Sequence, residues 1–154
     1  MISVNFIKSL IQETIIEKNF FLVEVKVSSS NKIEVYIDSE KGIRIEDCVL
    51  ISRLIEGQLD REKEDFALEV SSPGIDQSFK VKEQYLKNIN KNIEVLSLEG
   101  KKISGKLVLV NDEGFEVEEM KSKKHPETNK KVKEIVKHQF VYSRIKSAKL
   151  IIKF

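Results

Sequence analysis

The sequence predicts an α+β protein of two modules: an N-terminal two-layer α/β domain, ordered helix-strand-strand-helix-strand, followed by a C-terminal small β-barrel. Apolar residues recur at helical and strand spacing in the first half, and five short strands follow one another in the second half. The net charge changes sign, because residues 1–80 hold 10 basic and 15 acidic side chains whereas residues 81–154 hold 17 and 10. We therefore expect domains over 1–74 and 82–154, with a linker over 75–81.

The first module begins with an amphipathic helix, predicted over residues 3–18. Its apolar positions recur every three to four residues, at Phe6, Leu10, Ile11 and Ile15. Alternation then predicts two strands, which a turn of serine and asparagine residues joins into an antiparallel hairpin. The alternating apolar positions of these strands are Phe21, Val23, Val25, Val27, Ile33, Val35 and Ile37.

A second helix is predicted over residues 45–59, and a third strand follows around residues 66–70. The apolar face of this helix comprises Cys48, Ile51, Leu54, Ile55 and Leu59. Because Cys48 shares that face and has no second cysteine to pair with, we expect it in the core rather than as a nucleophile or ligand. Both helices should cover one face of the sheet.

The second module opens with a short helix near residues 83–88. Five strands are predicted after it, near residues 91–98, 102–110, 114–120, 132–140 and 146–153. Gly100 and Gly114 lie in short turns, and Gly105 inside a strand indicates a sharp bend or a bulge. Five short, bent strands in succession favour a small closed barrel.

The segment from Lys121 to Lys131 contains Pro126 and no other apolar residue, so we expect a mobile loop on the barrel rim. Residues 121–137 hold seven lysines and two glutamates, a net charge of +5. Two interpretations stay open: contact with nucleic-acid phosphates, which would be salt-sensitive and not base-specific, or an ordinary solubilising loop. The candidate RNA contacts are Lys121, Lys123, Lys124, Lys130, Lys131 and Lys133.

The sequence contains no recognisable catalytic or metal-binding pattern. It lacks a nucleophile elbow, a phosphate-binding glycine loop, paired cysteines and a helix-spaced partner for His125 or His138. A cluster of carboxylates is interpreted as a solvated loop and a helix N-terminus rather than a metal site. It comprises Asp38, Glu40, Glu46 and Asp47. We expect no enzyme activity, no cofactor, no membrane helix and, without a signal peptide, a cytoplasmic protein.

The stretch from Leu68 to Asp76 joins the two modules. An alternating strand runs into Ser71-Ser72-Pro73-Gly74-Ile75-Asp76, where proline fixes φ and glycine permits φ > 0, so the chain should turn. In the structural interpretation, side chains of Ser71, Ser72 and Asp76 cap this turn with hydrogen bonds to the backbone. In the functional interpretation, polar groups at a crevice between domains contact a partner. The local sequence favours the structural one.

These residues resemble the RimP family of bacterial ribosome maturation factors. The similarity lies in Ile51-Ser52-Arg53 with Leu59-Asp60, in Leu68 to Asp76, and in Tyr85, Ile93, Val95, Gly105 and Ile145 to Leu150. The resemblance implies an N-terminal α/β domain, a C-terminal Sm-like β-barrel and a non-enzymatic factor required for assembly of the small ribosomal subunit. It also implies binding of the immature subunit, through its rRNA and a ribosomal protein near the decoding centre, and release before translation.

The sequence departs from the family pattern at two places. Gln77 and Ser78 stand where arginine and proline are usual, so a positive charge and a rigid turn are lost at the junction. Asn90 stands where glycine is commoner, and asparagine tolerates the left-handed conformation. An alternative function is a stand-alone RNA-binding regulator using an oligomeric Sm-like barrel, whereas we expect a monomer. A hydrolase is disfavoured, because no nucleophile-base pair is recognisable.

Overall fold

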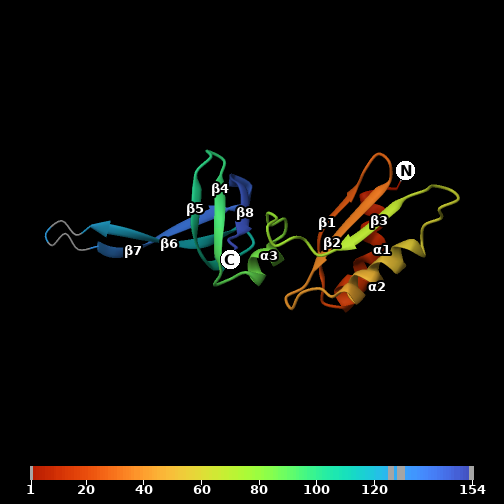
Figure 1. Cartoon of the computed structure of the whole chain (residues 1–154), viewed down its shortest axis with the longest axis horizontal. Coiled ribbons are helices and arrows are strands. Elements are labelled where there is room, and N and C mark those ends of the chain that lie inside the picture. Colours follow the sequence, from red (N-terminus) through yellow and green to blue (C-terminus); the bar gives the residue numbers. More distant parts are fainter. Residues whose placement is uncertain (1, 125–126, 128–130, 153–154) are drawn as a thin grey trace. The chain divides into compact units, whose positions relative to one another are not determined.

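The chain folds into two compact units, Met1–Gly74 and Ile75–Phe154. The structure is a computed structural model and describes residues 2–124, 127 and 131–152. The elements of the first unit are α1 (Val4–Glu17), β1 (Phe21–Val27), β2 (Lys32–Asp38), α2 (Ile45–Glu56) and β3 (Ala67–Ser71) (Figure 1). Their order confirms the predicted helix-strand-strand-helix-strand arrangement.

Helix α1 buries a narrow stripe of isoleucines. It begins at Ser3, whose Oγ accepts a hydrogen bond of 3.1 Å from the backbone N–H of Phe6. Ile7, Ile11 and Ile15 lie four residues apart and are buried. Phe6 is 44% exposed, so its predicted place on the apolar face is wrong. Adjacent helical residues are about 100° apart, which rotates Phe6 away from a stripe centred on the isoleucines.

Helix α2 is shorter than α1 and likewise buries isoleucines on one face. The Asp47 carboxylate accepts a hydrogen bond of 3.0 Å from the backbone N–H of Arg44 and so satisfies a donor at the start of the helix. Ile51 and Ile55 are fully buried. Cys48 is only half-buried, so its predicted core position is wrong. It lies almost a full turn before Ile51, close to the solvated start of the helix.

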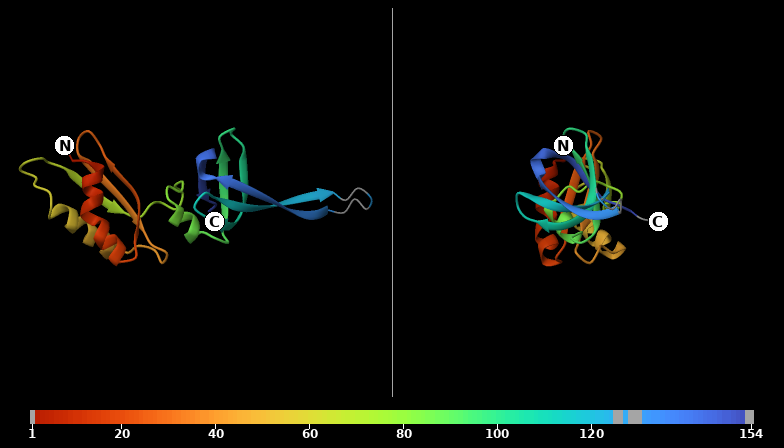
Figure 2. Two further views of the ribbon diagram at one scale, coloured as in Figure 1. Left: turned by 180° about the vertical axis from the view of Figure 1, so that it is seen from behind. Right: turned by 90° about the vertical axis from the view of Figure 1, so that its left-hand side faces the viewer.

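The sheet of the first unit packs both helices on one face. β1 and β2 form the predicted antiparallel hairpin, and β3 pairs in parallel with β2. Val25, Val35 and Val70 are neighbours across the three strands and join the isoleucines of both helices in one apolar cluster. The two helices therefore cover the same face, as predicted (Figure 2). Glu34 and Glu69, paired in register, alternate with these valines and belong to the other face.

The second unit contains a short helix and a five-stranded sheet. Its elements are α3 (Lys82–Lys87), β4 (Asn92–Ser97), β5 (Lys102–Val110), β6 (Gly114–Lys124), β7 (Lys131–Val141), the 3₁₀ turn η1 (Tyr142–Arg144) and β8 (Ile145–Leu150) (Figure 1). All pairs are antiparallel in the order β7-β6-β5-β4-β8, which confirms the α+β class. Among the described residues β7 and β8 are not paired, and closure into an Sm-like barrel stays a prediction.

An aromatic group fixes α3 to the strands of the second unit. Tyr85 on α3 is only 4% exposed. Its ring centroid lies 4.9 Å from that of Phe79, 4.7 Å from that of Phe115 and 5.2 Å from that of Tyr142. Such separations are typical of favourable aromatic pairs, so the rings add specific contacts to the apolar core beneath the helix.

Two backbone predictions in this unit have different outcomes. Asn90 has a φ of 74°, which confirms the left-handed conformation expected there. The predicted bulge is not at Gly105, because the pairing with β4 runs unbroken through it and the irregularity of β5 lies between Leu107 and Leu109. A Cβ at Gly105 would lie 2.4 Å from the backbone oxygen of Glu118, so glycine permits a close approach of β5 and β6.

Candidate functional site

The lysine-rich segment is largely a two-stranded β-ribbon, and the loop predicted from Lys121 to Lys131 is wrong over its strand residues. β6 continues to Lys124, and β7 begins at Lys131. Lys124 is paired with Lys131 across the two strands, and Lys121 is paired with Glu134. β5 pairs with β6 only as far as Glu118, so beyond this residue the ribbon has no third strand (Figure 1). Apolar alternation is the usual sign of a strand, and this segment lacks it.

The ribbon brings five of the six candidate lysines together at the end of β6 and the start of β7. These are Lys121, Lys123, Lys124, Lys131 and Lys133. Lys130 and His125 lie outside the described residues. Lys121 Nζ is 3.6 Å from Glu119 Oε1, and the side chains of Lys121 and Lys133 are exposed. An exposed ion pair contributes only about 0–1 kcal/mol, so Lys121 can exchange this partner for an external anion.

Exposed apolar side chains lie among the ribbon lysines. Met120 is 59% exposed and stands opposite Ile135, which is 55% exposed, while Val132 nearer the tip is 46% exposed. Directly opposed residues share one face of a ribbon, so Met120 and Ile135 place two apolar side chains next to each other on a face that is open to water. This pair could not be predicted from the sequence, because the register that places Met120 opposite Ile135 is not visible in either strand alone.

The remaining polar candidates have local partners. His138 Nε2 lies 3.1 Å from Glu119 Oε1 and links β7 to β6. Asp38 and Asp47 each accept a hydrogen bond from a backbone N–H close by in sequence. Within residues 2–124, 127 and 131–152, no three His, Cys, Asp or Glu side chains are grouped to hold a metal ion. No helix in these ranges is long and apolar enough to cross a membrane.

The junction lies open to solvent at several positions. Ser71 ends β3, and the boundary between the compact units falls after Gly74. Ile75 is 69% exposed, and Ser72 and Asp76 are also exposed. In the described part of the chain the side chains of Ser71, Ser72 and Asp76 make no hydrogen bonds, and the predicted caps are not observed.

The chain is thus a two-unit α+β protein with a lysine-rich β-ribbon and a junction that is exposed to solvent. A family model described as the RimP N-terminal domain matches residues 10–76. The chain is 36% identical over 151 residues to the ribosome maturation factor RimP of Flavobacterium psychrophilum, covering 96% of each protein. It is 38% identical over 132 residues to the protein of the same name from Porphyromonas gingivalis, covering 86% of this chain and 87% of the relative. This chain belongs to the RimP family of ribosome maturation factors, which are non-catalytic assembly factors in ribosome biogenesis.

Proposed function

We propose that this protein binds the immature small ribosomal subunit and promotes its assembly by binding alone. The observation that carries the proposal is the 36% identity to a ribosome maturation factor along 96% of both chains. An assembly factor can act without bond chemistry. If it binds one arrangement of RNA and protein better than the others, it raises the population of that arrangement in proportion to the difference in affinity.

The second unit is the proposed rRNA-binding part. It holds 18 basic and 11 acidic residues, a net charge of +7, and its ribbon concentrates lysines on two neighbouring strands. Lysine ammonium groups contact phosphates as point charges, which positions a protein on RNA without reading its sequence. The ribbon therefore supplies affinity and register on the rRNA, and the apolar pair Met120 and Ile135 adds a contact that does not depend on salt.

The first unit is the proposed contact for a basic ribosomal protein near the decoding centre. It holds 9 basic and 14 acidic residues, a net charge of −5. Its helices cover one face of the sheet, and the other face carries Glu24, Glu34 and Glu69. Complementary charge steers association and disfavours wrong partners. The junction from Ser71 to Asp76 sets how the two binding surfaces meet one target, and Gln77 and Ser78 leave it less rigid than in most of the family.

The role of the ribbon is tested by replacing Lys123, Lys124, Lys130 and Lys131 with glutamine. We expect the affinity for immature small subunits to fall at least about tenfold at low salt, with a shallower dependence on salt concentration, because each lost phosphate contact removes one unit of counterion release. The matched control replaces four exposed lysines of the same unit that lie away from the ribbon. These are Lys101, Lys102, Lys106 and Lys149. Unchanged affinity of the ribbon variant at every salt concentration would reject the ribbon as the contact.

Association with subunits is tested by sucrose-gradient sedimentation of a cell extract. The proposal expects co-migration with free small subunits and not with full ribosomes. A protein that stays at the top of the gradient and gives a ring-sized mass in light scattering would instead be the stand-alone RNA-binding regulator, whereas we expect a monomer.

A further inference from the structure

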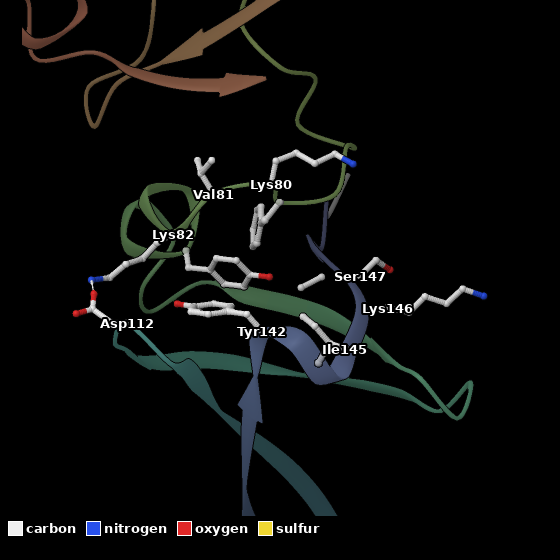
Figure 3. A pocket seen from close by; sticks show the side chains of 11 residues that line it. Lys80, Val81, Lys82, Asp112, Tyr142, Ile145, Lys146 and Ser147 are labelled. Carbon is white, nitrogen blue, oxygen red and sulfur yellow. Dashed lines mark hydrogen bonds and ion pairs between the residues drawn. The ribbon is translucent and has the colours of Figure 1, made fainter. Parts of the chain in front are cut away.

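The second unit contains a hollow of about 380 Å³ next to its aromatic group. The segment from Phe79 to Lys82 lines it together with Tyr85, Tyr142 and the first residues of β8 (Figure 3). The backbone N–H of Phe79 donates a hydrogen bond of 2.8 Å to the oxygen of Ala148, which fastens this segment to β8. The hollow lies within the size range of small-ligand sites, and residues of one unit build it completely.

Tyr85 presents an unused hydroxyl at this hollow. The side chain is 4% exposed, and in the described part of the chain its hydroxyl makes no hydrogen bond. Tyr85 is one of the residues that line the hollow. Burial and the neighbouring Tyr142 raise the pKa of Tyr85, so the hydroxyl keeps its proton and can donate. A buried hydroxyl without a partner is unfavourable, and a ligand that accepts this hydrogen bond removes that cost.

The charged groups around the hollow favour an anion on one side. Lys82 pairs with Asp112, and Figure 3 shows this pair on one side of Tyr142. Lys80 and Lys146 are both exposed and lie on the opposite side from Lys82 and Asp112 (Figure 3). With Lys82 neutralised by Asp112, the two remaining lysines give the rim a net charge of +2.

We propose that this hollow binds one nucleotide of a single-stranded RNA, the base lying against the Phe79 and Tyr142 rings and the flanking phosphates contacting Lys80 and Lys146. Tyr85 donates its hydroxyl proton to an acceptor on the base edge. Aromatic rings beside a cationic surface are the usual means by which proteins hold unpaired bases, because every base has a face for stacking. The Tyr142 hydroxyl already donates to the Asn111 oxygen at 2.8 Å, which fixes this ring in place. The inference rests on the proposed rRNA contact and places a second RNA site away from the ribbon.

The test measures the affinity of the full chain for a fluorescein-labelled oligouridylate of eight nucleotides by fluorescence anisotropy. Tyr85→Phe, which removes only the hydroxyl, should weaken binding about fivefold. Phe79→Leu, which keeps an apolar side chain and removes the ring, should weaken it about tenfold. The double variant Lys80→Gln, Lys146→Gln should also lose about tenfold. Circular dichroism checks that each variant is folded.

Two controls separate this site from general polyanion binding. The double variant Lys101→Gln, Lys102→Gln removes the same two positive charges at positions away from the hollow. Its affinity for the oligonucleotide should fall by less than about twofold, because salt screens charges that lie far from the bound nucleotide. A polyglutamate peptide of equal charge should not displace the oligonucleotide. Uridine monophosphate should bind at least about tenfold more weakly, because it carries only one of the two phosphates that flank a nucleotide within a chain.

Photocrosslinking with 4-thiouridine in the same oligonucleotide locates the contact, which we expect at Phe79, Tyr85 or Tyr142. The inference would be overturned if both Tyr85→Phe and Phe79→Leu bound the oligonucleotide with wild-type affinity, or if crosslinks were confined to the ribbon. It would also be overturned if polyglutamate displaced the oligonucleotide, or if uridine monophosphate bound as tightly as the oligonucleotide. Co-sedimentation with small subunits is measured in parallel. If the protein binds subunits but no oligonucleotide binds at the hollow, this inference is rejected and the proposed function stands. If the wild type fails to bind subunits, the proposed function is rejected.

Discussion

Gly105 is required at its position because two strands approach each other closely there. A Cβ at this residue would lie 2.4 Å from the oxygen and 2.9 Å from the carbonyl carbon of Glu118, and 2.7 Å from Cγ1 of Val117. The first two neighbours are backbone atoms, which no change of rotamer can move. Even one methyl group therefore forces β5 away from β6 and lengthens the hydrogen bonds between them.

Gly105→Ala should lower the free energy of unfolding by about 1–3 kcal/mol, the usual range for overpacking a close contact. Urea denaturation monitored by circular dichroism measures the change. Ser104→Ala is the matched control, because Ser104 is exposed on the same strand and its replacement should change stability by less than about 0.5 kcal/mol. Equal denaturation midpoints for Gly105→Ala and the wild type would contradict the close approach of the strands.

Cys48 should react slowly with thiol reagents at neutral pH. Burial and then the charge of Asp47 raise the pKa of this thiol, and only the thiolate attacks. The pH at which the reaction rate with dithiobisnitrobenzoate is half-maximal should therefore lie above that of the same chain unfolded in urea. A half-maximal pH at or below the unfolded value would show that the environment of Cys48 is wrongly described.

At the scale of elements, α2 depends on two buried residues rather than on its whole apolar composition. Ile55 is fully buried in the cluster shared with the sheet, whereas Leu50 on the same helix is 39% exposed. The sequence alone gives both residues similar hydrophobicity, but only one contributes its full side chain to the core.

Ile55→Ala should therefore destabilise the first unit by about 2–5 kcal/mol, the range for truncating a buried aliphatic side chain. Leu50→Ala should cost less than about 1 kcal/mol, since water already covers part of that side chain. Urea titration followed by circular dichroism compares the two variants. Similar losses from both would mean that the buried face of α2 is assigned to the wrong residues.

The regular elements could be predicted from periodicity, and the exceptions have physical reasons. Every α-helix and strand was predicted in its order, and the 3₁₀ turn η1 was not. Periodicity was clearest in α1, α2, β1 and β2, which bury apolar residues at regular spacing. Phe6 was placed on the wrong side of α1, because a sequence window does not fix where the centre of a stripe lies. The ribbon was missed beyond Met120, where two strands stabilise each other through backbone pairing with little apolar burial. The apolar pair and the hollow depend on contacts between distant residues, which no local pattern contains.

At the scale of the whole molecule, the division after Gly74 predicts two units that fold independently. Residues 1–74 and 75–154 expressed separately should each give a dispersed NMR spectrum that overlays on that of the full chain, except near the junction. A fragment of residues 1–64 is the control, because it lacks β3 and the buried Phe66 and should not fold. A disordered spectrum from either unit would contradict independent folding.

We propose that the protein favours an immature arrangement of the small subunit, and a comparison of its affinities for immature and mature subunits tests this proposal. Both are measured with one labelled protein preparation at a fixed salt concentration. We predict that immature subunits bind at least about tenfold more tightly, because a factor can shift an equilibrium only by the difference between its two affinities. Equal affinities for the two subunits would contradict the account, however tight the binding.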